Sequence, residues 1–297
     1  MKKEKIKFYL PGFYEHIGLN RFLFDLMREH PEYFYDNIEI GAVFGCFPGN
    51  IWNGGRTVLG FSDIHLIRDI IKEYDYLQIP MRFTWTNVLL TEEHYKNPIC
   101  NTIMELADNG INEVLVSEDN FEQYIRKTYP NYKIISSTTK CILTEKELNE
   151  ELNKDYDLVV LDHRLNHNFE LLDKIERKDK IEFLINPRCS PQCPNRKAHY
   201  LWESKNQIAG MEVVPPVNYN QNYKCPGYDF YNNKNLETIS NEELYNLYYH
   251  KGFFNFKIEG RTIHPLDVIE NYIYYMVKPE FKDYIKYLFI KNCSNWR

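Results

Sequence analysis

The chain is predicted to fold as an α/β protein, a TIM-like (β/α)₈ barrel in which eight parallel strands alternate with helices. Three observations predict this fold. Short runs of β-branched and aromatic residues alternate with amphipathic segments of helical length. The 297 residues exceed the roughly 250 that such a barrel needs. No glycine-rich phosphate loop follows the first strand, where PGFYEH stands instead. This favours the barrel over the alternative fold, an open doubly wound sheet.

Eight short runs have the composition expected of buried strands, because β-branched and aromatic residues are concentrated in each. In chain order they are residues 6–10, 38–44, 79–85, 113–116, 133–136, 157–162, 181–185 and 254–259. Between them, apolar residues recur every three or four positions, which indicates amphipathic helices. The expected helices are residues 14–28, 62–74, 98–109, 120–128, 145–153, 168–176 and 265–277.

The second of these helices shows the pattern and its start. Ile64, Ile67 and Ile71 fall on one stripe that can pack against a sheet. Ser62 precedes them, and a serine hydroxyl readily accepts a hydrogen bond from the unpaired amides of a first helical turn. We therefore expect Ser62 to be the N-cap of this helix.

The alternation of strands and helices is interrupted once, between the seventh and eighth strands. We expect a single barrel domain over residues 1–297, with an insertion at residues 187–251. Long loops inside a barrel are usually functional, and this one carries Cys189, Cys193 and Cys225. The insertion is therefore expected to contribute to a site.

The last predicted strand, within the segment GFFNFKIEGR, carries charges along one face. Side chains alternate along a strand, so Lys257, Glu259 and Arg261 share one face and the apolar residues between them share the other. The outer face of a barrel packs on helices, so the charged row is expected to point inward. An isolated buried ion is costly, so these charges must pair or serve a ligand. We predict that all three are catalytic.

Four cysteines are candidate metal ligands. Cys189 and Cys193 form a C-x₃-C pair directly after the seventh strand, in a loop stiffened by prolines. Cys46 follows the second strand and Cys225 lies in the insertion, so all four are expected at the rim where barrel active sites are built. Four thiolates suit a [4Fe–4S] cluster or a structural zinc, whereas Cys46 is alternatively a small buried hydrophobe. Packing roles are expected for the other cysteines, Cys100, Cys141 and Cys293.

Further polar residues are expected near the same rim. Asp162 and Arg164 stand at the end of the sixth strand, and Arg82 points inward on the third. Arg196 follows the C-x₃-C pair. We interpret these four as substrate-binding residues. The alternative is a structural ion network inside the barrel, in which the arginines pair with Asp162 and Glu259.

Two histidines also lie near these residues. His163 follows Asp162 and is a further member of the same polar group. His199 is a candidate fourth ligand of a Cys₃His zinc site, and a surface or capping role is its alternative.

Composition limits the class of function. The net charge is −6, which gives no general basic footprint for nucleic acid, so any affinity for RNA must come from a local patch. The basic N-terminus is followed by only a short apolar run, and no stretch approaches the roughly 20 apolar residues of a membrane helix. We expect a cytoplasmic protein with no membrane segment. The sequence has no G-x-S-x-G, H-E-x-x-H or Walker motif.

KIEGR after an aromatic strand, together with the C-x₃-C pair and the downstream Arg196 and Tyr200, resembles the collagenase-like peptidase family U-32. The resemblance covers about residues 6–277. Despite the family name, its better understood branches are similar to oxygen-independent hydroxylation proteins that act on tRNA, rRNA or the ubiquinone ring. The resemblance implies a [4Fe–4S] cluster held by four cysteines.

The chain departs from the family pattern after the sixth strand. Many members place two cysteines there, whereas this chain reads DHRLNHNFELL. Cys46 is expected to replace one of them, as an early cysteine does in one branch, and Cys225 matches a downstream family cysteine loosely. Arg196 is displaced by two residues from the usual position. The chain therefore resembles a minimal, divergent member.

Three functions follow from these observations. The first is an iron–sulfur enzyme that transfers a hydroxyl from a donor such as prephenate to an RNA or a small aromatic substrate. Lys257 and Arg261 would hold anionic groups, and Glu259 would orient them or move a proton. The second is a peptidase, which needs a nucleophile–base pair or a hydrolytic metal. The third is a non-catalytic barrel that binds a metal or a partner within a homo- or hetero-oligomer.

Overall fold

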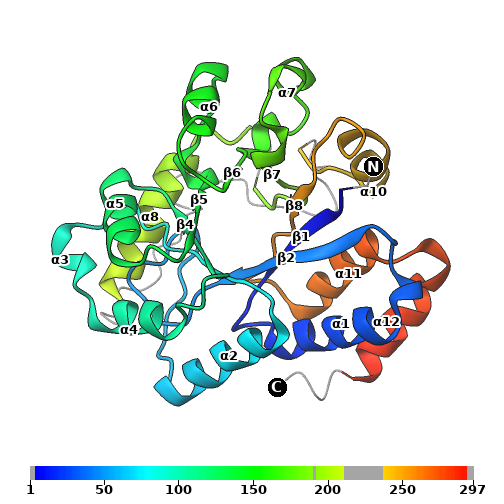
Figure 1. The fold of residues 1–297 in the computed structure, drawn as a ribbon, viewed down its shortest axis with the longest axis horizontal. Helices are drawn as coiled ribbons and strands as arrows, with labels where there is room; N and C mark the ends of the chain where they lie inside the picture. Colours follow the sequence, from blue (N-terminus) through cyan, green and yellow to red (C-terminus); the bar gives the residue numbers. More distant parts are fainter. Residues whose placement is uncertain (1–3, 190–191, 211–236, 293–297) are drawn as a thin grey trace.

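Eight parallel strands pair in chain order and close into a barrel in this computed structural model, which describes residues 4–189, 192–210 and 237–292 (Figure 1). Strand β1 pairs with both β2 and β8, which closes the sheet. The (β/α)₈ fold expected from the sequence is confirmed. The strands are β1 (Ile6–Pro11), β2 (Ile38–Gly45), β3 (Met81–Phe83), β4 (Glu113–Val116), β5 (Lys133–Ser136), β6 (Leu158–Val160), β7 (Ile181–Leu184) and β8 (Asn255–Lys257).

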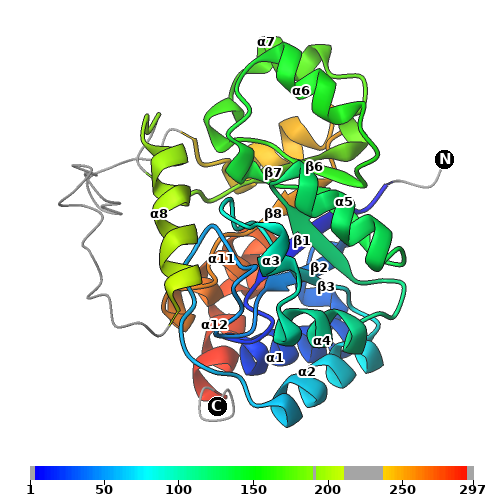
Figure 2. The ribbon, with the colours of Figure 1, turned by 90° about the vertical axis from the view of Figure 1, so that its left-hand side faces the viewer.

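Helices surround the barrel (Figures 1 and 2). All seven expected helices have counterparts, and α3, α8, α10 and α12 add to that set. Within the described ranges, no helix combines the length and apolarity needed to cross a membrane. The helices are α1 (Ile17–Glu29), α2 (Ile64–Leu77), α3 (Glu92–Tyr95), α4 (Pro98–Leu106), α5 (Asp119–Thr128), α6 (Glu145–Leu152), α7 (Phe169–Lys174), α8 (Arg196–Ala209), α10 (Asn241–Glu243), α11 (Pro265–Met276) and α12 (Lys282–Lys291). Shorter turns are η1 (Pro31–Tyr33), η2 (Thr138–Lys140), η3 (His163–Leu165), η4 (Lys178–Lys180), η5 (Leu244–Tyr248) and η6 (Pro279–Phe281).

The expected N-cap of α2 is wrong by one residue. Asp63, not Ser62, caps the helix, and its carboxylate accepts hydrogen bonds from the amides of His65 at 2.7 Å and Leu66 at 3.3 Å. The Ser62 hydroxyl instead donates to the carbonyl oxygen of Pro48 at 3.3 Å. Both residue types cap helices well, so the local pattern alone did not separate them.

The last strand is oriented as its alternation predicts. Phe256 is fully buried on the outer face, and its ring stacks on that of Phe183 on β7 with centroids 6.0 Å apart. Ile258 is likewise fully buried. Lys257, Glu259 and Arg261 line a cavity inside the rim of the barrel. Strand β8 ends at Lys257, so the other two charged residues belong to the loop that follows it.

A buried ion network fills the lower interior of the barrel. Arg82 on β3 is fully buried, and its Nε donates to Glu113 Oε2 on β4 at 2.6 Å. Its Nη1 donates to both carboxylate oxygens of Glu182 on β7, at 2.6 and 2.7 Å. The guanidinium also lies 4.1 Å from the centre of the Tyr9 ring on β1. The expected pairing of Arg82 with Asp162 or Glu259 is therefore wrong, because nearer carboxylates within the barrel neutralise it.

Helix α8 stands across the carboxyl ends of the strands (Figure 2). The Glu203 carboxylate accepts a hydrogen bond from the amide of Thr57 at 2.6 Å, in the loop after β2. Asn87, after β3, donates its Nδ2 to the carbonyl oxygen of Ser204 at 3.1 Å. The first part of the expected insertion at residues 187–251 therefore closes over the barrel mouth. Cys225 and the rest of residues 211–236 lie outside the described residues.

Replacing Arg82 by methionine is expected to lower the free energy of unfolding by about 3–5 kcal/mol, because it leaves the buried carboxylates of Glu113 and Glu182 without their cation. Urea denaturation followed by circular dichroism measures the change. The matched control is Lys146→Met, which removes an exposed pair with Glu150 at 3.9 Å and should cost less than about 0.5 kcal/mol. A loss below about 1 kcal/mol for Arg82→Met would contradict a stabilising role of the network.

Candidate functional site

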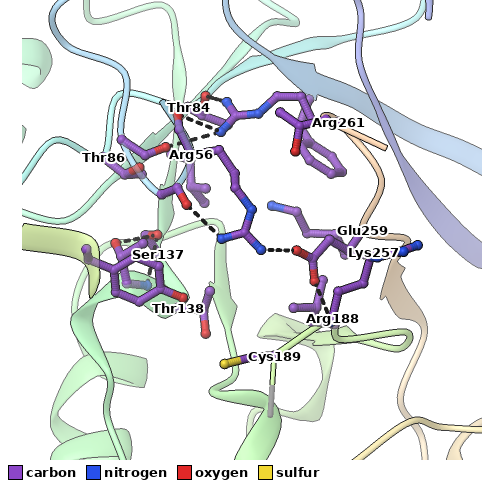
Figure 3. A pocket seen from close by; sticks show the side chains of 18 of the residues that line it. Arg56, Thr84, Thr86, Ser137, Thr138, Arg188, Cys189, Lys257, Glu259 and Arg261 are labelled. Carbon is purple, nitrogen blue, oxygen red and sulfur yellow. Dashed lines mark hydrogen bonds and ion pairs between the residues drawn. The ribbon is translucent and has the colours of Figure 1, made fainter. Parts of the chain in front are cut away.

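The carboxyl ends of the strands surround a cavity of about 370 Å³, shown from close by in Figure 3. Loops after several strands, together with helix α8, supply its walls, so residues distant in sequence meet there. Active sites of this fold are built at this end of the barrel. The polar lining residues include Arg56, Thr84, Thr86, Ser137, Thr138, His163, Arg188, Cys189, Arg196, Tyr200, Lys257, Glu259 and Arg261.

Positive side chains dominate this cavity. Of the described residues that line it, five are lysine or arginine and one, Glu259, carries a carboxylate. A concave site with such an excess of cations attracts anions and can bind a carboxylate or phosphate through charge-assisted hydrogen bonds. The five are Arg56, Arg188, Arg196, Lys257 and Arg261.

Glu259 is held as an ionised carboxylate. Its Oε1 accepts a hydrogen bond from Arg56 Nη2 at 2.5 Å, and its Oε2 accepts one from the backbone amide of Arg188 at 3.0 Å. Burial opposes ionisation, but these two partners hold the pKa of Glu259 below its ordinary value. An ionised, hydrogen-bonded carboxylate orients its neighbours and is poorly suited to donate a proton at neutral pH.

Arg261 builds the wall of the cavity. Its Nη1 donates to Asn53 Oδ1 at 2.9 Å and to the hydroxyl of Thr84, and its Nη2 donates to the carbonyl oxygen of Gly54 at 3.3 Å. The loop after β2 is thereby fixed against β3. Only glycine fits at position 54, where the loop after β2 passes close to the segment after β3, because a Cβ there would lie 2.3 Å from the backbone of Thr86. Arg261 therefore positions the loop that carries Arg56.

Lys257 differs from the other cations of the cavity. Its side chain is 6% exposed, and its ammonium lies 4.0 Å from the centre of the Phe44 ring. Among the described residues, its ammonium makes no ion pair and no hydrogen bond. Burial lowers the pKa of Lys257 to about 8. Glu182 opposes this shift, whereas Arg82 and Arg261 add to it.

Of the four predicted substrate-binding residues, Arg196, Asp162 and Arg164 lie together, and Arg82 lies apart from them. Arg196 lines the cavity, and its guanidinium donates to the Tyr200 hydroxyl at 2.6 Å and to Asp162 Oδ1 at 3.3 Å. Asp162 also accepts two hydrogen bonds from the Arg164 guanidinium, both at 2.9 Å, so these two residues form a support behind Arg196. Burial opposes ionisation of Asp162, but the two arginines hold its pKa below the ordinary value. Arg82 lies lower in the barrel and is not a lining residue.

His163 also lines the cavity and is oriented by a carboxylate. Its Nδ1 lies within hydrogen-bond distance of Glu237 Oε2, and both side chains are buried. Burial opposes ionisation of Glu237, but hydrogen bonds from His163 and the Gln192 amide hold its pKa below the ordinary value. His163 Nε2 is buried without a partner in the part of the chain that the structure describes. This arrangement is that of an imidazole base held in one orientation.

The predicted metal ligands are brought together only in part. Cys189 lines the cavity with its thiol beside that of Cys193, and burial raises the pKa of Cys189 to about 12. Cys46 is fully buried in the core around the barrel, where its thiol lies 3.8 Å from Arg261 Nη1. Cys225 lies outside the described residues. Within those residues, no three His, Cys, Asp or Glu side chains form a group that could hold a metal ion.

The remaining cysteines and His199 have other roles. Cys100 and Cys141 are buried, as expected of packing residues, and Cys293 lies outside the described residues. His199 Nε2 lies 3.0 Å from Glu203 Oε1, one turn further along α8. Of the four predicted metal ligands, the described residues therefore bring only Cys189 and Cys193 together.

Several residues of the site are additions to those expected from the sequence, and two of them, Arg56 and Glu237, pair with predicted residues. Arg56 pairs with Glu259 across more than half of the chain, and Glu237, in the later part of the expected insertion, pairs with His163. The adjacent Gly54 and Gly55 were a signal for Arg56, because a glycine pair marks a loop that can approach another backbone closely. No local pattern marks Glu237.

The fold is similar to that of a solved structure of the U32 peptidase Mk0906, with a TM-score of 0.54 and a sequence identity of 15%. The match covers 88% of this chain and 95% of that one. No protein-family model matches the chain, and no curated protein matches it at a significant level. At this identity the similarity shows a U32-like barrel fold, and the chemistry of the site must be argued from its own residues.

The contact between His163 and Glu237 predicts one tautomer of the imidazole. Because ionised Glu237 only accepts hydrogen bonds, neutral His163 should carry its proton on Nδ1 and leave Nε2 unprotonated. Nitrogen-15 NMR of histidine-labelled protein measures the tautomer. Glu237→Gln should shift His163 toward the Nε2–H form, whereas Glu242→Gln, at an exposed position on α10, should leave it unchanged. A dominant Nε2–H form in the unaltered protein would contradict the geometry.

Proposed function

We propose that this protein is an enzyme with a U32-like barrel that binds a small anionic substrate in the cavity at the barrel mouth. The excess of cationic side chains over the single carboxylate of Glu259 carries the proposal. Carboxylates pair with Arg56, Arg196 and Arg188, whereas Lys257 and Arg261 have none within ion-pair distance among the described residues and add net positive charge for a ligand. A cavity of about 370 Å³ is in the range that holds metabolite-sized molecules.

The lining residues suggest how such a substrate would be held. Arg196, supported by Asp162 and Tyr200, offers a planar guanidinium that suits a carboxylate or phosphate. Phe44, Leu115 and Leu184 line the same cavity and can cover an aromatic or aliphatic part of the substrate. The proposal therefore includes small aromatic anions, and also an RNA that presents a single nucleotide to the mouth.

A more specific form of the proposal is oxygen-independent hydroxylation with a [4Fe–4S] cluster. The specific observation in its favour is that Cys189, which lines the cavity, has its thiol beside that of Cys193. Cys225 would add a third thiolate, and a further residue or a partner subunit would supply the fourth ligand. Cys46 fits this set poorly, because its thiol lies in the core beside Arg261. When bound, the cluster would supply redox or Lewis-acid chemistry at the barrel mouth.

A peptidase is the alternative favoured by the name of the structural neighbour. The oriented imidazole of His163 is the observation that supports it, because a peptidase needs such a base. Cys189 is the cysteine that lines the same cavity, but the raised pKa of its thiol makes it a poor nucleophile at neutral pH. The geometry therefore favours anion binding over peptide hydrolysis.

Arg56→Gln is expected to weaken the binding of a small dianion roughly tenfold, because it removes one cation and leaves the Glu259 carboxylate unbalanced beside the ligand. Isothermal titration calorimetry with prephenate and with inorganic phosphate, at low ionic strength, measures the affinity. Arg68→Gln, at an exposed position on α2, is the matched control and should bind as the unaltered protein does. Equal affinity in all three proteins, or no binding of either anion, would contradict the proposal.

The cluster is tested separately, by metal analysis of anaerobically purified protein. The double change Cys189→Ala with Cys193→Ala should abolish bound iron and the brown colour near about 400 nm that iron–sulfur charge transfer gives. Cys46→Ala is the matched single change and should retain both, because Cys46 is buried beside Arg261 and does not line the cavity. Iron that survives the double change would show that these cysteines are not ligands. Colourless protein with one zinc would favour the non-catalytic metal-binding barrel.

A further inference from the structure

Anion binding does not explain why the ammonium of Lys257 is buried in the cavity without a carboxylate partner in the part of the chain that the structure describes. All four lining arginines have side-chain partners: Arg56 contacts Glu259 at 2.5 Å, Arg196 contacts Tyr200 at 2.6 Å, Arg261 contacts Asn53 at 2.9 Å and Arg188 contacts Asp267 at 3.9 Å. Lys257 has no such partner among the residues described. Figure 3 shows its amine directed into the cavity, between the side chains of Arg56 and Arg261.

The surroundings of Lys257 make its ammonium easier to deprotonate than that of an exposed lysine. A buried ammonium that lacks a hydrogen-bonded carboxylate is costly, and this cost favours loss of its proton. The titratable and charged groups around it are Glu182 on β7, Arg82 on β3, and Glu259 and Arg261 after β8. The carboxylates favour the charged form and the arginines oppose it, so burial decides the balance and lowers the pKa to about 8.

A desolvated lysine amine beside other cations is, once it has lost its proton, a nucleophile toward carbonyl carbon. The phenyl ring of Phe44 lies against the amine and excludes water from that side. The other side opens into a cavity whose arginines suit a carboxylate. A molecule that carries a carbonyl next to a carboxylate would satisfy both features at once.

We propose that Lys257 forms an imine with the carbonyl carbon of a 2-oxo acid bound in this cavity. The substrate class rests on the proposed function, namely anion binding at the barrel mouth. The Nζ lone pair forms the new C–N bond, and the carbonyl π electrons move to oxygen, which takes up a proton. The resulting carbinolamine loses that oxygen as water after a second protonation, while the nitrogen gives up one proton to solvent. The sum is amine, carbonyl compound and one proton giving a protonated imine and water, with no change of oxidation state.

The imine is tested by trapping with pyruvate and sodium cyanoborohydride, which reduces a protonated imine to a stable secondary amine. Full-length protein is incubated with both reagents and digested, and the labelled lysines are located by mass spectrometry. Near pH 8 the neutral fraction of Lys257 should exceed that of an ordinary lysine roughly a hundredfold. Its peptide should therefore be labelled far faster than that of the exposed Lys146, which serves as an internal control.

The pH dependence and two variants sharpen the test. Labelling of Lys257 should rise between about pH 7 and 9, whereas that of surface lysines rises only near their ordinary pKa of about 10.4. Lys257→Arg keeps the positive charge and should lose the adduct while retaining the circular dichroism spectrum of the unaltered protein. Lys257→Met serves the same purpose if the larger arginine does not fit.

Propanal, an uncharged carbonyl compound, separates failure of the inference from failure of the proposed function. Preferential labelling of Lys257 by both pyruvate and propanal, with Arg56→Gln slowing only the pyruvate reaction, is the expected result. Labelling by propanal but not by pyruvate would support the reactive amine and overturn the 2-oxo acid as its substrate. If neither compound labels Lys257 faster than Lys146, the imine is overturned, and anion binding still stands on its own titration.

Discussion

The buried guanidinium of Arg82 is the interaction on which the interior of this barrel depends. It joins β3 to carboxylates on β4 and β7 and lies against a tyrosine ring on β1, so one side chain spans the barrel. Such a charge is tolerated because hydrogen bonds at 2.6–2.7 Å replace its lost hydration. The network also influences the site above it, because Arg82 and Glu182 act in opposite directions on the protonation of Lys257.

The mouth of the barrel is built as a second, separate polar layer. Arg261 fixes the loop after β2 against β3, and that loop presents Arg56 to Glu259. On the opposite side, Asp162 supports Arg196, the first residue of helix α8. Most of the charges at the rim therefore hold one another in place, so the cavity is preorganised for a ligand. Lys257 lies between the two layers.

The likeness to a U32 peptidase concerns the barrel, and the site has features of its own. The sequence motif that suggested a four-cysteine centre corresponds to two adjacent thiols in the described residues, with Cys46 placed in the core. A histidine oriented by Glu237 and a lysine without a carboxylate partner stand at the same cavity. These residues, more than the fold, define the chemistry that the protein can perform.

The sequence by itself determined the eight strands, their order and the inward face of Lys257, Glu259 and Arg261, because strand periodicity and helix amphipathicity are local properties. It also indicated the cluster of polar residues at the strand ends. Only the tertiary structure decided which side chains pair with one another. Arg82 pairs with Glu113 and Glu182, and Cys46 faces the core, because burial and charge pairing depend on which distant segments meet when the barrel closes.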